Sequence, residues 1–144
     1  MISGVRLVPR QTFGDDTGTV MRMLRKTDEE FVDFGEVYVS SVNARQRKPW
    51  RRHREATSNL IVPSGSVRFV LFEEQSVPVN NLNVMEFELG VTNHQLLIIP
   101  PNIWFALVST SDTTSLIVNC SNVVHQSTLV DRRAFSDTRM PNIG

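Results

Sequence analysis

The sequence predicts an all-β domain, and three features support this prediction. Short runs rich in Val, Ile, Leu and Phe recur at intervals of about ten residues through most of the chain. Gly, Pro and Asn separate these runs, as they do between the strands of a sandwich or barrel. Helix signals are few. A chain of 144 residues is long enough for one domain with a core of its own.

The first part of the chain predicts two strands and one helical turn. Residues 5–9 alternate in the manner of a short strand, and turn-forming residues fill 13–18. A second strand is expected over 20–24. Thr27 and the three acids behind it form an N-cap pattern, which predicts a short helical turn near Phe31.

From residue 35 onward the pattern is almost entirely β. The expected strands are rich in β-branched residues or alternate in polarity, and turns or a rigid double-proline corner separate them. They cover residues 36–42, 59–62, 66–72, 84–89, 95–99, 104–108 and 115–119. Residues 128–135 are expected to form a helix that packs outside the sheets, and residues 136–144 a loose tail.

A basic run at residues 45–54 is the most unusual feature of the chain. Six of its ten residues are Lys or Arg, although the chain has 15 basic and 15 acidic residues and no net charge. A chain without a basic surplus is not typical of nucleic-acid binders, so no nucleic-acid partner is expected. The run predicts either a local anion site or a solvated edge.

Arg51 and His53 are two residues apart on an expected strand, so their side chains share a face. If that face points into the domain, the pair forms a cationic floor suited to a carboxylate, a diphosphate or a ketone oxygen. The alternative is that they pair with acids across the sheet, and Glu36, Glu73 and Glu88 are the candidates.

Cysteine count and hydropathy limit the environment of the protein. Cys120 is the only cysteine, which excludes an intramolecular disulfide and a zinc site of the multi-cysteine type. No run approaches the ~18 apolar residues of a membrane span. These features predict a cytoplasmic protein without a membrane partner.

Five short motifs occur in a fixed order along the chain. They are FGDDTG at 13–18, WRRH at 50–53, VPSG at 62–65, IPPNIW at 99–104 and VNCS at 118–121. This order resembles the cupin-fold family of dTDP-4-dehydrorhamnose 3,5-epimerases. The resemblance covers residues 4–137, which we expect to be a single cupin domain, and leaves 138–144 as a C-terminal tail.

The resemblance implies a double-stranded β-helix, the cupin jelly roll, with one or two short helices. It also implies a nucleotide-sugar pocket inside the roll that needs no metal and no organic cofactor. The expected assembly is a homodimer in which the N-terminal strands cross to the partner.

The residues that do chemistry match this family less well. Lys48 keeps the family's basic position, whereas Arg51 occupies the position of the histidine that removes the proton next to the sugar ketone. A guanidinium is not deprotonated at working pH and cannot act as an ordinary general base. The chain therefore resembles a divergent member that lacks the usual catalytic histidine.

Further family positions also differ. Ser58 aligns with the lysine that would steady the enolate oxygen, and it brings a hydrogen bond without a charge. Phe105 aligns with the histidine after the proline corner. Thr17 replaces the arginine of the phosphate-binding turn, and Arg22 lies close behind it.

The same positions argue against a metal. A resemblance to metal-binding cupins would require two histidines two residues apart on one strand, a glutamate shortly after them, and a third histidine on a later strand. Here only His53 and Glu55 match, because Arg51 and Phe105 stand at the other two positions, and about three protein ligands are usual.

Tyr38 and Ser40 share a face of the preceding strand and are candidates to wall the same pocket. Tyr38 is a candidate general acid, although a structural tyrosine is the more common case. Trp104 is a candidate to stack on a nucleotide base, or else a core residue. The candidate catalytic residues are therefore His53, Arg51 and Tyr38, and the candidate substrate-binding residues are Lys48, Ser40, Ser58, Arg22 and Trp104.

Three functions remain open at this point. The first is an epimerase or isomerase that enolises a nucleotide-linked keto-sugar, with His53 as the only ring nitrogen placed to move a proton and Arg51 steadying the enolate. The second is a non-catalytic protein that binds a sugar nucleotide or another anion. The third is an interaction module whose basic run contacts an acidic partner.

Overall fold

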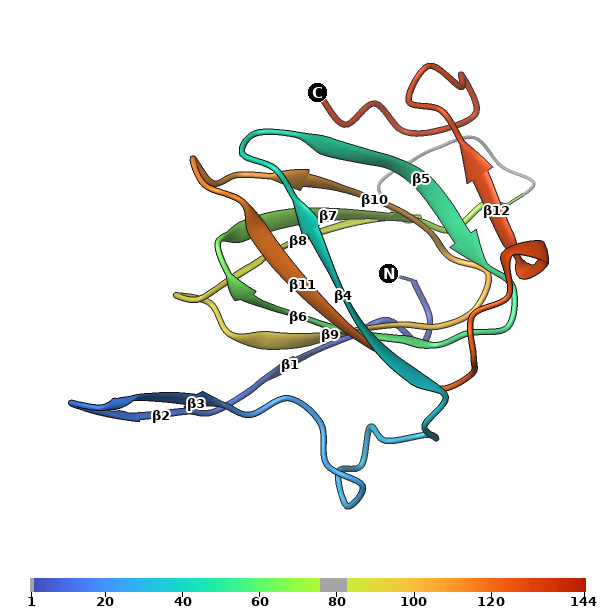
Figure 1. Ribbon diagram of the computed structural model, residues 1–144. Helices are drawn as coiled ribbons and strands as arrows, with labels where there is room; N and C mark the ends of the chain where they lie inside the picture. Colours follow the sequence, from blue (N-terminus) through green and yellow to red (C-terminus); the bar gives the residue numbers. More distant parts are fainter. Residues whose placement is uncertain (1, 76–82) are drawn as a thin grey trace.

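The computed structural model describes residues 2–75 and 83–144, and almost all of its regular structure is antiparallel β-sheet (Figure 1). Two five-stranded sheets face each other and form a roll. The first has the order β1 (Arg6–Pro9), β9 (Gln95–Ile99), β6 (Ser58–Ser64), β11 (Ser115–Ser121), β4 (Glu36–Val42). The second has the order β12 (Val130–Arg133), β5 (Arg47–His53), β10 (Trp104–Ser109), β7 (Ser66–Phe72), β8 (Val84–Gly90). The prediction of an all-β domain is confirmed.

The core lies between the two sheets, because alternate residues of each strand point inward. Leu60, Leu97 and Ile117 from the first sheet pack with Phe69 and Phe105 from the second, and all five are at most 5% exposed. This apolar interior fills one end of the roll. Polar residues replace it toward the edges β4 and β12, and the candidate site lies there.

A second apolar cluster covers the outer face of the second sheet. Trp50 and Trp104 are its largest members, and the C-terminal segment adds Met140 and Ile143, which are 7% and 6% exposed. The expectation of a loose tail at 136–144 is therefore wrong, because two side chains of this segment are buried. Its two apolar side chains cover tryptophans that would otherwise face water.

The helix expectations are also wrong. Residues 128–135 form strand β12 after the 3-10 helix η1 (Ser127–Leu129), because this stretch pairs with β5 in the register Arg132 to Arg51. The segment near Phe31 contains only turns, so η1 is the only helix among the described residues. Pairing with a free sheet edge overrides weak helix propensity.

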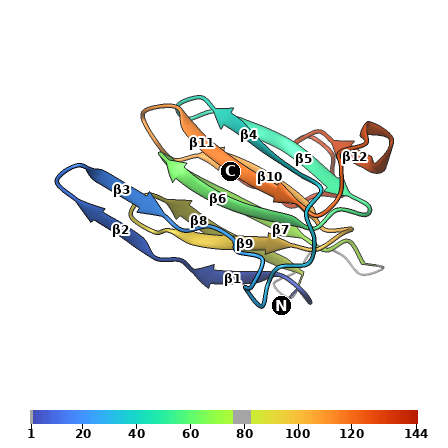
Figure 2. The same ribbon diagram turned by 60° about the horizontal axis from the view of Figure 1, so that its bottom comes forward.

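Strands β2 (Thr12–Asp15) and β3 (Gly18–Met21) form a hairpin that extends away from the roll (Figure 2). The turn residues at 13–18 thus lie within a hairpin, not in an open loop. Asp15 accepts hydrogen bonds from the backbone and side chain of Thr17, which shapes the tight turn. In the described part of the chain, no helix has the length and apolarity needed to span a membrane.

Candidate functional site

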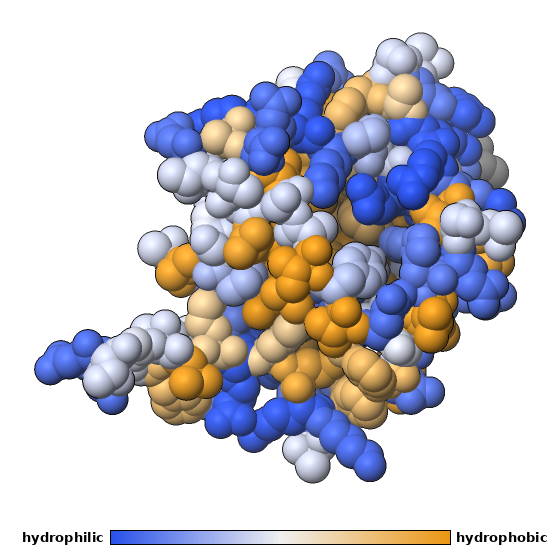
Figure 3. Space-filling view, in the orientation of Figure 1, coloured by the Kyte–Doolittle hydropathy of each residue, from blue (hydrophilic) through white to orange (hydrophobic). Residues whose placement is uncertain are grey.

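Three adjoining hollows lie at the polar end of the roll, and Tyr38 lines all of them. The largest, of about 260 Å³, opens between β4 and β12, where the surface in Figure 3 is hollowed. We call the three hollows together the Tyr38 pocket. Its polar lining comprises Glu36, Tyr38, Ser40, Arg51, His53, Glu55, Ser58, Asn119, Ser121, His125, Gln126 and Arg132.

Strand β5 directs Arg51 and His53 into this pocket and Trp50 and Arg52 to the outer face, as alternation along a strand requires. Lys48 would face outward by the same alternation. A bulge changes this. The partners of Phe105 and Leu107 on β5 are Arg51 and Lys48, so one extra residue is inserted between the two pairs. Lys48 therefore joins Arg51 on the inner face.

Arg51 is a partly buried cation that has no acidic partner among the described residues. Arg132 lies directly opposite it on β12, and the ring of Phe105 is 5.9 Å from its guanidinium carbon. Within residues 2–75 and 83–144 no carboxylate is within 4.0 Å of Arg51, Arg132 or Lys48. Burial, followed by the charge of Arg132, lowers the pKa of Arg51. Glu36 and Glu55 also line the pocket, but neither is paired with these three cations, which therefore form a site for an anion.

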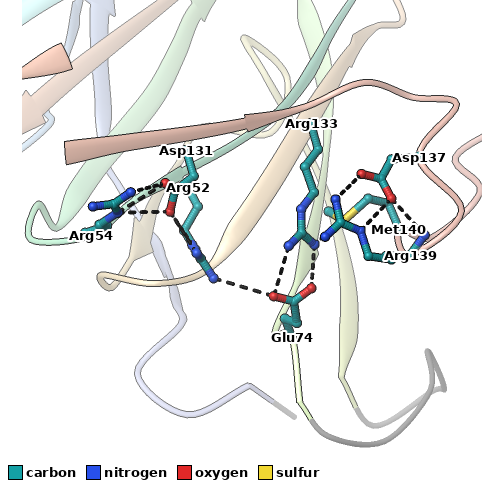
Figure 4. A network of polar contacts seen from close by, with 8 residues as sticks. All are labelled: Arg52, Arg54, Glu74, Asp131, Arg133, Asp137, Arg139 and Met140. Carbon is teal, nitrogen blue, oxygen red and sulfur yellow. Dashed lines mark hydrogen bonds and ion pairs between the residues drawn. The ribbon is translucent and has the colours of Figure 1, made fainter. Parts of the chain in front are cut away.

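The alternative of ion pairs across the sheet is wrong for this face. Glu36 accepts a hydrogen bond from the backbone N–H of His125, and Glu88 accepts from Ser66 and Thr110. The arginines of the outer face, by contrast, are neutralised. Arg52 and Arg54 both bind Asp131, at 2.7 Å and 2.6 Å (Figure 4).

His53 is held as a neutral imidazole. Its ring stacks on Phe105 with centroids 5.8 Å apart and meets the ring of His125 edge-on at 6.4 Å. Burial, followed by the charges of Arg51, His125 and Arg132, lowers its pKa to about 4. Its Nε2 atom is buried and has no hydrogen-bond partner among the described residues. At neutral pH the ring is therefore uncharged, and one of its two nitrogens can accept a proton.

A hydrogen-bonded group fixes the opposite wall. Asn119 on β11 donates from its side-chain nitrogen to the Tyr38 hydroxyl oxygen at 2.8 Å and to Ser58 Oγ at 3.4 Å. Ser40 lies two residues beyond Tyr38 on β4 and lines the innermost hollow. The structure therefore brings together His53, Arg51, Tyr38, Ser40 and Ser58, with Lys48 on the same inner face.

Trp104 is not part of this site. It lies on the outer face of β10, is 1% exposed and packs with Trp50. The guanidinium carbons of Arg52 and Arg133 lie 4.7 Å and 4.4 Å from its ring. The assignment of Trp104 as a substrate-binding residue is wrong, because the strand register turns Phe105 inward and Trp104 outward.

Arg22 also lies outside the pocket. It follows β3 at the base of the hairpin, where its guanidinium carbon is 5.5 Å from the ring of Phe13. Its backbone carbonyl accepts a hydrogen bond from His94. Within one chain, Arg22 does not line the Tyr38 pocket.

Several pocket residues were not predicted from the sequence, among them Asn119, Arg132 and His125. Asn119 had one usable signal, since it is a polar residue two places after the inward-facing Ile117. Arg132 and His125 had none, because the first lay in a stretch that predicted a helix and the second in a polar loop. His53 is thus not the only ring nitrogen at the site.

Arg51 and Phe105, the two positions that depart from the metal-binding pattern, both lie beside His53. The ring of Phe105 stacks on that of His53. In the described part of the chain, no three His, Cys, Asp or Glu side chains converge on one point.

Comparison with known proteins places this chain in a family. No family model and no curated protein matches the sequence. Among solved structures, a dTDP-sugar isomerase from Desulfovibrio desulfuricans is 31% identical, with a TM-score of 0.90 over 97% of this chain and 90% of that one.

Two less similar structures share the fold. A sugar 3,4-ketoisomerase variant from Thermoanaerobacterium thermosaccharolyticum, in complex with TDP-4-keto-6-deoxyglucose, has 22% identity and a TM-score of 0.72, and covers 92% of this chain and 90% of that one. A dTDP-4-dehydrorhamnose 3,5-epimerase from Sulfolobus tokodaii has 19% identity and a TM-score of 0.79, and covers 98% and 82%. Both confirm the predicted jelly roll. The chain therefore belongs to the cupin-fold family of dTDP-sugar isomerases and dTDP-4-dehydrorhamnose 3,5-epimerases.

Proposed function

We propose that this protein isomerises or epimerises a nucleotide-linked keto-sugar by enolisation. One observation carries the proposal: a neutral imidazole, an unpaired guanidinium and a phenol face the same pocket. His53 is the base, Arg51 stabilises the negative charge on the enolate oxygen, and Tyr38 exchanges a proton with that oxygen. Arginine at position 51 thus supplies charge, and the imidazole of His53 supplies the base.

The arrangement favours isomerisation. After His53 removes a proton from the carbon next to the ketone, its imidazolium can return that proton to the neighbouring carbon on the same face of the sugar. Epimerisation needs delivery from the opposite face. One buried imidazole is therefore sufficient for isomerisation, and the relative with 31% identity is described as a dTDP-sugar isomerase.

The charges of the pocket support an anionic substrate. Lys48, Arg51 and Arg132 face inward or line the opening, and none has a carboxylate within 4.0 Å in the described part of the chain. We propose that Arg51 and Arg132 contact the keto-sugar and the diphosphate, and that Lys48, Ser40 and Ser58 contact other oxygens of the ligand.

The decisive experiment follows ring protons by NMR in deuterated water with dTDP-4-keto-6-deoxyglucose. We expect deuterium to enter the sugar ring and a second keto-sugar to form. His53→Asn should slow exchange at least about 100-fold. His94→Asn is the matched control, since His94 contacts the hairpin and not the pocket. Absence of exchange above the blank with several keto-sugars would refute enolisation.

A protein that binds the sugar nucleotide without turning it over is the second candidate. The unpaired cations favour it as much as they favour catalysis. Thermal unfolding separates the two, since stabilisation by a ligand grows as RT ln(1 + [L]/Kd) even without turnover. Stabilisation without exchange would identify a binding protein. Arg51→Met should reduce the shift, whereas Arg45→Met should not, because Arg45 is exposed and pairs with Asp112.

The structure offers less to the third hypothesis, an interaction module built on the basic run. Arg45 pairs with Asp112, and Arg52 and Arg54 pair with Asp131. Arg47 donates to the carbonyl of Gly144 and lies over Phe135. Four of the run's cations are therefore already engaged, and they are poorly suited to recruit an acidic partner.

We further propose that the protein is a cytoplasmic homodimer. Apolar residues gather over β4 and β11 on the outside of the first sheet (Figure 3), where Val37, Val39 and Leu116 are 52%, 61% and 38% exposed. A second copy is the proposed occupant, with the β2–β3 hairpin crossing to it and Arg22 reaching the partner's pocket. Light scattering of the wild type and of Val39→Lys tests this, and a monomeric wild type would contradict it. The proposed compartment follows from cysteine usage, since the chain has a single cysteine, Cys120, and no disulfide of its own.

A further inference from the structure

The side chain of Asn119 has only one orientation that satisfies its neighbours. It is 4% exposed, and its Oδ1 accepts a hydrogen bond from the backbone N–H of Asn59 at 3.1 Å. An amide oxygen is an acceptor and an amide nitrogen a donor, so the NH₂ group must face the other way. It points at Tyr38 Oη, 2.8 Å away, across the register pair Asn119 and Tyr38.

This contact determines where the phenol proton of Tyr38 can go. The hydroxyl oxygen already accepts from Asn119, so the O–H bond must point elsewhere. No acceptor for it is found among residues 2–75 and 83–144, and Tyr38 lines all three hollows of the pocket. The proton is thus free to bind an oxygen of a ligand inside the roll.

We propose that Asn119 is a positioning residue that keeps Tyr38 a hydrogen-bond donor toward the reacting carbonyl oxygen. The inference rests on the proposed enolisation and assigns a part of it. Asn119 does not touch the substrate. It acts through Tyr38, and the backbone of Asn59 holds it in place.

The proposed isomerisation takes place in two halves, and His53 and Tyr38 each give and take one proton. A nitrogen of His53 takes the proton from the carbon next to the ketone, and the C–H electron pair becomes the new C=C bond. The carbonyl π electrons move to oxygen, which takes the Tyr38 proton. The products are an enediol, an imidazolium and a phenolate. In the second half, the imidazolium gives its proton to the neighbouring carbon, and the phenolate recovers a proton from the oxygen that becomes the new carbonyl.

The phenolate formed in the first half is stabilised where it stands. It keeps the hydrogen bond from the Asn119 amide, and Arg51, a positive charge, lines the same hollow as Tyr38. A hydrogen bond to a charged acceptor is stronger than one to a neutral acceptor. Asn119 therefore stabilises the charged intermediate more than the resting state, which is the requirement for a contribution to kcat.

Asn119→Asp tests this directly. The carboxylate can still accept from the backbone of Asn59, but it cannot donate to Tyr38 and instead accepts the phenol proton. We expect kcat to fall about 10-fold to 100-fold with KM little changed. The same substitution in a Tyr38→Phe background should cause no further loss, because the residue acts through the hydroxyl. Asn93→Asp is the matched control, since it removes a side-chain amide donor outside the pocket.

A second measurement does not depend on activity. Tyr38 is the only tyrosine of the chain, so protein labelled with [13Cζ]tyrosine gives one signal. In Asn119→Asp the phenol changes from acceptor to donor, and we expect the signal to move downfield, toward the position of a phenolate. The Asn93→Asp signal should stay at the wild-type position.

The outcomes are distinct. Wild-type exchange together with a fully active Asn119→Asp variant, or an unmoved tyrosine signal, would overturn the inference and leave enolisation standing. An additional loss in the Tyr38→Phe background would show a merely structural role. No exchange in the wild type would refute the proposed reaction and with it the catalytic part of Asn119, whatever the tyrosine signal shows.

Discussion

The buried imidazole of His53 should make the stability of the protein depend on pH. Its pKa is about 4 in the folded protein, against an ordinary value of 6.5, chiefly because of burial. Between these two values the unfolded chain binds a proton on His53 that the folded chain does not. Acid therefore favours unfolding. The part of the free energy of unfolding that depends on a neutral His53 is fully present above pH 6.5 and is lost as the pH falls toward 4.

The magnitude follows from the difference between the two values. At about 1.4 kcal/mol for each pKa unit, the full difference corresponds to about 3.5 kcal/mol. Water in the open part of the pocket screens the charge on the ring. We therefore expect a little less than half of this amount, about 1.5 kcal/mol, to appear in the free energy of unfolding.

Urea unfolding of the wild type and of His53→Asn between about pH 7.5 and about pH 4.5 measures this contribution. The fluorescence of the two tryptophans, Trp50 and Trp104, reports on the fold. Carboxylates affect both proteins alike, so the difference between the two free energies isolates His53. The wild type should lose about 1.5 kcal/mol more than the variant over this range.

Two results would refute the reasoning. One is a free-energy difference that stays constant with pH, and the other is a His53 NMR signal that titrates near 6.5. The low pKa also predicts that kcat/KM stays at its neutral value down to about pH 5, because the base of the free enzyme is still unprotonated there.

Three further predictions concern the fold and use thermal or chemical unfolding. Gly65→Ala should lower the free energy of unfolding by more than about 2 kcal/mol, since Gly65 has φ +83° and a Cβ there would lie 2.1 Å from Ser115 Oγ. Gly18→Ala should cost less stability, because Gly18 also has a positive φ but a Cβ there would meet no atom within 4 Å. Equal losses in the two variants would rule out the clash as the cause. Met140→Ala should lower the free energy of unfolding by about 2–3 kcal/mol, because Met140 packs in the outer apolar cluster. Thr138→Ala is the control and should have no effect, because Thr138 is exposed. A Met140→Ala variant as stable as the wild type would contradict this packing. Asp131→Asn leaves Arg52 and Arg54 without their shared carboxylate and should lower Tm by about 3 °C at low salt, with a smaller effect at high salt; a loss independent of salt would show that the charge is not the cause.

Local pattern determined a large part of this protein. Strands such as Glu36–Val42 and Ser66–Phe72 could be predicted because alternation and β-branching are properties of neighbouring residues. The same alternation puts Arg51 and His53 on one face, and the five motifs in order indicated the family. The sequence therefore predicted the roll and the central pair of the pocket.

Strand pairing decided the rest. Alternation states that Trp104 and Phe105 face opposite ways, but only the register of β10 between β5 and β7 states which of them is inside. The bulge between Lys48 and Arg51 turns Lys48 inward, and this bulge exists only in the pairing of β5 with β10, a strand distant in the sequence.

Other features of the pocket join residues far apart in the chain. Arg132 reaches Arg51 only because β12 adds to a sheet edge, and Asn119 reaches Tyr38 only across the pairing of β11 with β4. Such contacts are made by hydrogen bonds between strands distant in sequence, and no local propensity encodes them. Residue types and their spacing thus determined the scaffold, whereas tertiary pairing decided which side chains share the pocket and how its protons are held.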